Sequence, residues 1–251
     1  MTVWRSPAEL LQHALGRSRL VLMNEAHSGL RRCVRTREVG RRLLPLAHAL
    51  GVRHLAMEAL WDRDVAACAN GTRSLEEGLD GYLAQPDMRA LVATALELGW
   101  TLHGYEADVE VLRRSGPETW EDINWREQQQ GRNLGALVAA VPPAESVLAW
   151  CGNGHLCRRA GPVVHDGDPD VMWTPMGSLV AGFCGFEPFA IDQTVTAAFE
   201  AEPAWLEEYR DVLGAHGGTA GFLAGDAPEG LAWLGDAADA YLLSLDNALV
   251  E

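Results

Sequence analysis

The stretch Leu20-Val-Leu-Met-Asn-Glu-Ala-His27 places four apolar residues directly before an acid and a histidine. A short apolar run of this kind is typical of a buried strand in a parallel sheet. On an extended chain, residues i and i+2 project to the same side, so we expect Glu25 and His27 to share one pocket. The stretch therefore predicts a central strand whose carboxyl end carries chemistry.

Similar apolar runs alternate with helical periodicity along the chain, a pattern that indicates βαβ units. Apolar residues that recur every three or four positions predict helices near Val39–Leu50, Met88–Leu96 and Asp122–Val141. The expected strands are Arg19–Met23, His54–Met57, Thr101–Tyr105, Ser146–Trp150, Ala181–Cys184, Phe189–Asp192 and Ala240–Ser244. We predict an α/β fold with a mainly parallel central sheet flanked by helices, and an active site at the carboxyl edge of the strands.

The chain has 251 residues, of which 48% are hydrophobic, and this suffices to bury the core of one domain. We expect a single α/β domain over residues 1–251. Glycine and proline pairs such as Gly217-Gly218 and Ala227-Pro228 are typical of loops. The segment at about 201–238 is therefore expected to be a peripheral loop and helix.

The net charge and the composition of the chain disfavour several classes of binding partner and of chemistry. A formal net charge of −15 disfavours binding to nucleic acid or to anionic membranes. All basic residues are arginine, which excludes lysine Schiff-base and P-loop chemistry. The five cysteines include no C-x-x-C pair, and neither a signal peptide nor a membrane-length apolar run is present. We expect a cytoplasmic protein with a small-molecule substrate; the sequence indicates no oligomeric state.

Acids and histidines follow four successive predicted strands. Glu25 and His27 follow the first, Glu58 the second, Glu106 the third and His155 the fourth. A single acid after a strand is often only the N-cap of the next helix. Because the carboxyl ends of parallel strands meet at one edge, four such strands predict a shared catalytic or metal site.

Polar residues on other segments are expected to complete this site. The apolar stripe of the helix at 122–141 becomes polar at its N-terminal end, where Arg126 and Gln130 lie beside the strand ends. The alternative is that these polar groups mark a frayed, solvated helix start. A cluster of arginines after His27 offers Arg35 as an anion-binding residue, although such a cluster is also typical of a solvated helix face.

The turn before His155 reads Gly152-Asn153-Gly154, which allows the backbone to approach a ligand closely. Asn153 is therefore a candidate substrate-binding residue together with Arg35, Glu106 and Gln130. The alternative for His155 is a core histidine that caps a tight turn.

The ordered set of NEAHSGLRR, the second-strand glutamate, WREQQQGRNL, GNGH and MGSLV, over roughly residues 18 to 195, resembles the superfamily of erythromycin esterase-like, ChaN-like haem-binding and TIKI/TraB proteins. The resemblance implies a catalytic role for His27 with Glu25, Glu58, His155 and Arg126. This sequence departs from the pattern at Asn24, where the family usually has glycine, and in its Glu-Ala-His spacing. It also lacks the extra helical domain of macrolide esterases.

The first hypothesis is a small-molecule hydrolase or related acid/base enzyme. In it His27 activates water, Glu25 and Glu58 orient it, and His155 with Arg126 stabilises the developing charge. In a variant, a divalent metal such as Mn, Fe or Zn binds at this edge of the sheet. Its candidate ligands are Glu25, His27, Glu58, Glu106 and His155. The second hypothesis is a haem-binding protein in which Tyr105 is an axial ligand.

Overall fold

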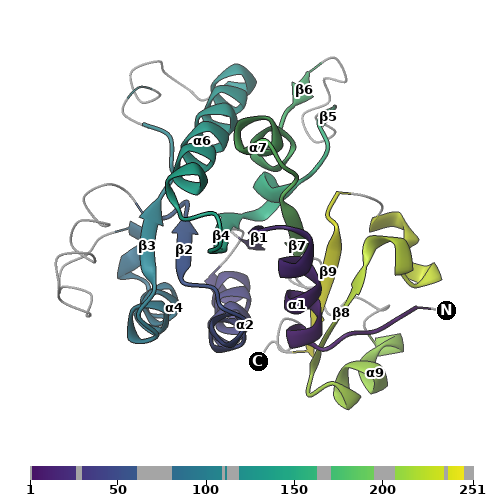
Figure 1. The fold of residues 1–251 in the computed structure, drawn as a ribbon. Coiled ribbons are helices and arrows are strands. Elements are labelled where there is room, and N and C mark those ends of the chain that lie inside the picture. The colour runs from purple at the N-terminus through teal and green to yellow at the C-terminus, as the bar shows by residue number, and fades with distance from the viewer. Residues whose placement is uncertain are drawn as a thin grey trace.

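The computed structural model describes residues 2–26, 30–60, 81–108, 111, 119–162, 171–194, 207–234 and 237–245. Within these ranges, seven strands form one sheet in the order β3-β2-β4-β1-β7-β9-β8 (Figure 1). They are β1 (Leu20–Glu25), β2 (His54–Met57), β3 (Thr101–Gly104), β4 (Val147–Gly152), β7 (Phe189–Asp192), β8 (Thr219–Leu223) and β9 (Ala240–Ser244). All neighbouring strands are parallel except β8 and β9. The predicted α/β fold with a mainly parallel sheet is confirmed.

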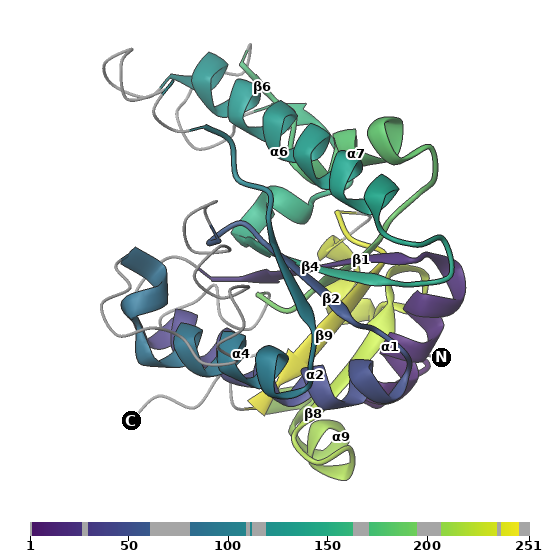
Figure 2. The ribbon, with the colours of Figure 1, turned by 60° about the vertical axis from the view of Figure 1, so that its left-hand side comes forward.

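Helices cover both faces of the sheet (Figure 2). The described α-helices are α1 (Pro7–Arg17), α2 (Leu30–Ala49), α4 (Pro86–Glu97), α6 (Trp120–Ala140), α7 (Met176–Cys184) and α9 (Arg210–Ala215). Helices α1, α2 and α4 lie on one face, and α6 and α7 lie on the other (Figure 1). None of the helices in the described ranges is both long enough and apolar enough to span a bilayer.

The strand residues divide between these two faces with the period of two that an extended chain imposes. On β1, Val21 and Met23 belong to the core packed against α1, α2 and α4, whereas Leu20 and Leu22 belong to the core beneath α6 and α7. The strands β2 and β4 alternate in the same way. A one-residue difference in position after a strand therefore decides which face a side chain reaches.

Helix α6 is fixed at both ends. At its start, Thr119 and Asp122 form a capping box that satisfies the first free backbone N–H groups. At its end, the Arg19 guanidinium donates to the carbonyls of Val138, Val141 and Pro142. These contacts hold the polar N-terminal half of α6 beside the carboxyl edge of the sheet.

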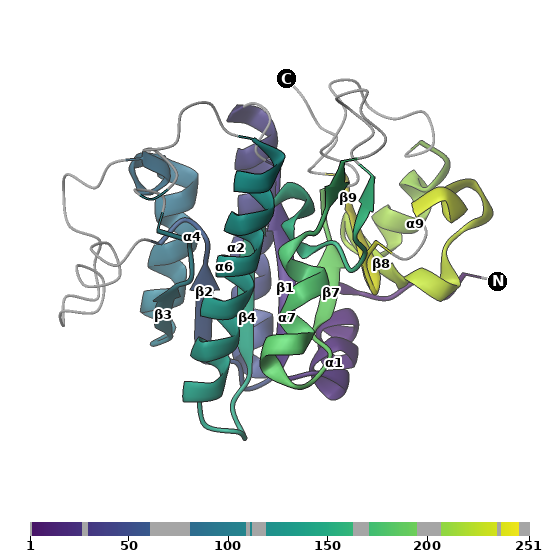
Figure 3. The same cartoon turned by 90° about the horizontal axis from the view of Figure 1, so that it is seen from above.

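Helices α6 and α7 lie side by side over the sheet (Figure 3). They pack closely because α6 has glycine where α7 approaches: a Cβ on Gly135 would lie 2.6 Å from that of Phe183. The segment Ala181–Cys184 is thus the end of a helix, and its prediction as a strand is wrong. Within this segment Gly182 and Phe183 are exposed, as a buried strand would not allow. A short apolar run cannot by itself distinguish a strand from a helix.

The C-terminal part of the sheet departs from the expected peripheral loop and helix. Within residues 201–238, β8 pairs antiparallel with β9, and positive φ angles at Gly217 and Gly218 make the turn that leads into it. The segment also contains α9 and short 3-10 turns at Ala224–Asp226 and Glu229–Leu234. The strand Thr219–Leu223 contains a glycine and only one β-branched residue, Thr219, so its composition gives little indication of a strand.

Candidate functional site

The register of the sheet aligns a row of polar side chains beneath α6. Asn24 of β1 pairs with Cys151 of β4, and Met57 of β2 pairs with Trp150, so Glu58 follows beside Cys151. The amide N–H of Glu58 donates to the Trp150 carbonyl at 3.1 Å and continues the ladder by one residue. Side chains alternate between the two faces along a strand, so Glu58, which follows Met57, lies on the α6 face of the sheet.

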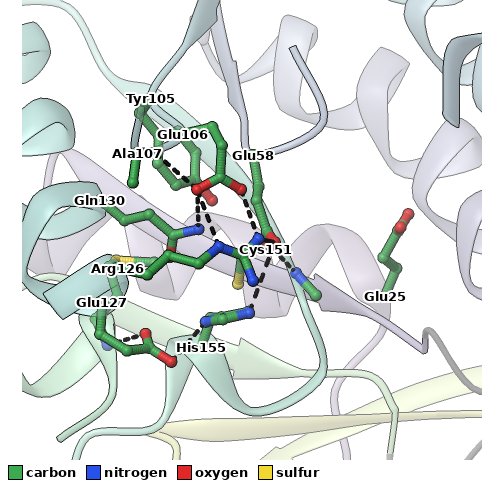
Figure 4. Close-up of polar contacts among 12 residues, drawn as sticks. Glu25, Glu58, Tyr105, Glu106, Ala107, Arg126, Glu127, Gln130, Cys151 and His155 are labelled. Carbon is green, nitrogen blue, oxygen red and sulfur yellow. Dashed lines mark hydrogen bonds and ion pairs between the residues drawn. The ribbon is translucent and has the colours of Figure 1, made fainter. Parts of the chain in front are cut away.

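Arg126 of α6 joins the acids that follow β2 and β3 (Figure 4). Its Nη2 lies 2.7 Å from Glu58 Oε1 and 2.6 Å from Glu106 Oε2, and its Nε lies 3.1 Å from Glu106 Oε1. The backbone N–H of Gly152 donates to Glu58 Oε2 at 2.8 Å. Two largely buried carboxylates are therefore held around one guanidinium, the geometry in which charge-assisted hydrogen bonds are strongest.

Glu106 is tied to α6 by a second residue. The fully buried Gln130 donates from Nε2 to Glu106 Oε1 at 3.0 Å, and the Ala107 N–H donates to the same oxygen at 2.7 Å. Asn133 donates to the backbone carbonyls of Tyr105 and Glu106. The polar start of α6 is thus packed against the strand ends, and the alternative of a frayed, solvated start does not hold.

His155 lies on the other side of Glu58, in the 3-10 turn η2 (Asn153–Leu156) that follows β4. Its Nδ1 is 2.8 Å from Glu127 Oε1 and its Nε2 is 3.6 Å from Glu58 Oε1. The Nδ1 contact is a close ion pair that lacks the near-linear geometry of an N–H···O hydrogen bond. Two carboxylates therefore flank one imidazole.

Glu127 is fully buried and receives two further donors, which fix its orientation. Trp173, from the β5 (Gly161–Pro162) and β6 (Met172–Trp173) hairpin, donates from Nε1 to Oε1 at 2.9 Å. The Met176 N–H at the start of α7 donates to Oε2 at 2.7 Å. A helix N-terminus stabilises an anion, so the Glu127 carboxylate is positioned to stabilise a positive charge on His155.

The charge state of His155 follows from these neighbours. Burial disfavours the imidazolium, but the carboxylates of Glu58 and Glu127 outweigh burial and raise the pKa of His155 to about 9. The same site buries Arg126, yet Glu106 and Glu58 raise the pKa of its guanidinium above the ordinary value. At neutral pH the site holds two cations among three carboxylates.

Both cations keep donors that can face a ligand. Arg126 uses Nε and Nη2 on the two carboxylates, while Nη1 has no hydrogen-bonded partner within the described part of the chain. The Arg126 side chain is 27% exposed and that of His155 is 15% exposed, so both reach the surface of the site. Such a pair can stabilise negative charge that develops on a substrate oxygen.

Glu25 does not join this group, contrary to the predicted convergence. It lies one residue beyond Asn24 and so turns to the opposite face, where Arg37 of α2 donates to both its oxygens at 2.7 and 2.8 Å. Trp150 donates from Nε1 to Glu25 Oε2 at 2.8 Å, and Arg37 also pairs with Asp87 of α4 at 2.9 Å. Figure 4 shows Glu25 well apart from the Arg126 group. Glu25 anchors the end of β1 to α2 and α4.

Three of the predicted site residues cannot be placed as side chains. His27 lies outside the described residues, and of Arg35 and Asn153 only the backbone is described, in α2 and in η2. The roles predicted for them stay predictions. Glu58, Glu106, Arg126, Gln130 and His155 are brought together.

Several candidate ligands of the metal and haem hypotheses are described in the structure, and their contacts can be compared with those roles. Among those residues, no group of three or more His, Cys, Asp or Glu side chains is placed to hold a metal, and Glu25 is engaged elsewhere. The metal set also includes His27, so metal binding stays a prediction. Tyr105 is buried and donates its hydroxyl to the Trp150 carbonyl at 2.9 Å, which occupies the atom that would bind haem iron.

Two residues outside the predicted set contact members of it: Glu127 contacts His155, and Arg37 contacts Glu25. Glu127 lies on the inward stripe of its helix, and that position was the signal by which it could have been included. Arg37 lies in the arginine cluster, but only its burial against Glu25 separates it from the other arginines. The residue predicted from this cluster is Arg35.

A close contact between α7 and η2 leads to a testable prediction. A Cβ on Gly177 would lie 2.1 Å from the backbone oxygen of Leu156, next to His155. Gly177→Ala is therefore expected to lower the free energy of unfolding by about 1–3 kcal/mol, as overpacking does. The matched control is Gly182→Ala in the same helix, where nothing lies within 4 Å of the added Cβ. Urea unfolding of both variants tests this; equal stability of the two would contradict the contact.

Comparison with solved structures finds proteins with a similar fold. No family model and no curated protein matches the chain. RRSP, a MARTX toxin effector domain from Vibrio vulnificus CMCP6, aligns with TM-score 0.50 and 14% identity over 76% of this chain and 36% of that one. A structure described as bacterial protein toxins aligns with TM-score 0.54 and 14% identity over 75% of this chain and 36% of that one. The chain thus spans about a third of these structures, and at this identity the likeness shows the fold alone.

The family assignment made from the motifs is corrected by these comparisons. The two aligned structures are a toxin effector domain and a structure described as bacterial protein toxins. The predicted membership of the erythromycin esterase-like, ChaN-like and TIKI/TraB superfamily is therefore wrong. The motifs that carried it are short, and their residues follow strand ends, where parallel sheets of many kinds carry polar side chains. What remains is the site itself, which the geometry defines without reference to a family.

Proposed function

We propose that the chain is a hydrolase that uses acid/base chemistry on a carbonyl substrate. The observation that carries the proposal is the pair of cations, Arg126 and His155, that lie on either side of the Glu58 carboxylate. A carbonyl oxygen that gains negative charge in the transition state would meet Arg126 Nη1 and His155 Nε2. Preorganised donors of this kind contribute about 10²–10³-fold each to the rate.

Proton transfer in the proposed reaction is assigned to one residue. His27, which follows β1 closely in sequence, is proposed as the base that takes a proton from the attacking water. Water oxygen then bonds to the carbonyl carbon, and the oxyanion forms at the two cations. When the intermediate collapses, the bond to the leaving group breaks and the proton passes from His27 to the departing atom.

The three glutamates differ in their roles. Glu58 is the one that both cations contact, and it orients them toward the substrate. Glu127 holds His155 in its protonated form, and Glu106 holds Arg126. Glu25 is proposed to act at a distance: its contacts with Arg37 and Trp150 set the direction in which the chain leaves β1 toward His27.

The substrate class determines how the proposal is tested. Toxin effector domains that share the fold are compatible with an enzyme, so protein and peptide substrates belong beside small esters in a screen. The purified chain would be incubated with each class in H₂¹⁸O, and products would be read by mass spectrometry. Hydrolysis places one ¹⁸O in the acid product, which distinguishes water attack from group transfer to another acceptor.

His27→Ala is the variant that tests the base. Loss of a well-placed general base is expected to reduce turnover by about 10²–10⁴-fold while circular dichroism stays unchanged. His216→Ala is the control and should keep wild-type turnover, because His216 ends α9, which packs against β8 at the edge of the sheet opposite β3. Wild-type turnover by His27→Ala on the substrate found in the screen would refute the assignment.

A further inference from the structure

A second cluster of titratable side chains lies at the amino end of the sheet, away from the Arg126 site. It joins His54, the first residue of β2, to His103 of β3 and to Glu145 in the segment between α6 and β4. His54 Nδ1 lies 3.0 Å from His103 Nε2, and His54 Nε2 lies 2.5 Å from Glu145 Oε2. Three separate segments of the chain thus meet at one imidazole.

The geometry of the two rings identifies the contact as a hydrogen bond. The ring centres are 5.3 Å apart and the two nitrogens 3.0 Å apart, so each nitrogen points almost directly at the other. Two ligands of one metal would instead converge on a third point. An imidazole pair in this arrangement shares a single hydrogen, since one nitrogen must donate and the other accept.

Counting hydrogens shows how many protons the cluster accepts. When both rings are neutral, His54 donates to Glu145 and accepts the N–H of His103. A first added proton makes His54 an imidazolium that donates to both neighbours, and every contact survives. A second added proton gives both facing nitrogens a hydrogen, and the bond between the rings cannot form.

We propose that His54, His103 and Glu145 form a proton-operated latch, which tolerates one proton and opens on the second. Opening frees β3, the edge strand of the sheet, from the side-chain contact that ties its third residue, His103, to β2 and through His54 to the segment before β4. Glu106 follows β3 closely and holds Arg126, so the latch connects acidification to the Arg126 site through a single short strand.

The charges around His103 favour this behaviour. His54 of β2 is the titratable group that contacts His103, and Glu145 contacts the other ring nitrogen of His54. Arg53 turns away and donates to the carbonyls of His48 and Val52. Within the described ranges, no carboxylate pairs with His103. Burial and the charge of His54 lower the pKa of His103, so the second proton enters at a pH below about 6.5, the ordinary histidine value. The stability that the bond supplies is present above that pH and is lost as the pH falls through the lowered pKa.

The direct test observes the shared hydrogen in the whole chain. With ¹⁵N-labelled histidine, a coupling between His54 Nδ1 and His103 Nε2 across the hydrogen bond is expected at pH 7.5. It should disappear as His103 titrates below about pH 6.5. A coupling that persists after His103 has titrated, or no coupling at any pH, would overturn the latch.

A variant separates the latch from the general effect of acid. His103→Gln keeps a side chain that can hydrogen bond to His54 but cannot take a proton. The urea midpoint of the wild type is expected to fall more steeply than that of His103→Gln between pH 7 and 5, and His216→Gln should behave as the wild type does. Parallel curves for the wild type and His103→Gln would show that the second proton does not open the cluster.

Discussion

Arg126→Ala is expected to lower the free energy of unfolding by about 3 kcal/mol at pH 7, because it removes the cation that separates two largely buried carboxylates. Its Nη2 contacts Glu58 at 2.7 Å and Glu106 at 2.6 Å, so both lose a charge-assisted hydrogen bond at once. The Arg126 side chain is 27% exposed, which keeps the loss at the lower end of the range for broken buried pairs. Urea unfolding at pH 7 measures it.

A comparison sharpens this prediction. Arg41→Ala breaks an exposed pair with Glu38 on α2 and should cost less than about 1 kcal/mol. If Arg126→Ala and Arg41→Ala were equally stable at pH 7, the cluster around Arg126 would not be the buried network described.

His155→Gln is expected to reduce kcat/KM about 10²-fold or more on the substrate found by the screen, because glutamine fills a similar position but carries no charge. In the wild type, activity should decline as the pH rises through about 9, where the imidazolium loses its proton. Stability should decline in the same direction: a raised pKa contributes stability fully below about pH 6.5 and loses it as the pH approaches 9. A pH–rate profile and thermal unfolding measure the two effects.

A matched control distinguishes the charge of His155 from its packing. Glu127→Gln keeps the size of the side chain and removes the carboxylate 2.8 Å from His155 Nδ1. The alkaline limb of its pH–rate profile should move to lower pH, while its turnover at the optimum falls less than that of His155→Gln. An unmoved alkaline limb would assign that limb to another group.

The fold was largely predictable because buried parallel strands leave a strong signal. The run at residues 20–23, the strands after it and the helix at 122–141 follow from apolar periodicity, and the structure has them within a few residues. Helix α7 is short and contains two glycines, so its sequence gives no clear helical period and its end resembles a strand. The strand β8 is not predicted because its five residues include one glycine and a single β-branched residue, Thr219.

Most residues of the site could be predicted from the sequence, but the separation of Glu25 onto the opposite face of the sheet could not. Glu58, Glu106, Arg126, Gln130 and His155 meet as the strand-end pattern indicated. Glu25 separates from them because β1 runs as a strand through Glu25 itself, which sends that side chain to the α2 face. Where a strand ends cannot be read to one residue from sequence, and a single residue decides the face.

The protonation of His155 tests the account most directly, because its positive charge rests on Glu58 and Glu127 together. An NMR titration of the His155 ring nitrogens should give a pKa of about 9, and Glu127→Gln should lower it. A His155 pKa at or below about 6.5, unchanged in Glu127→Gln, would contradict the two-cation site and the hydrolase proposed from it.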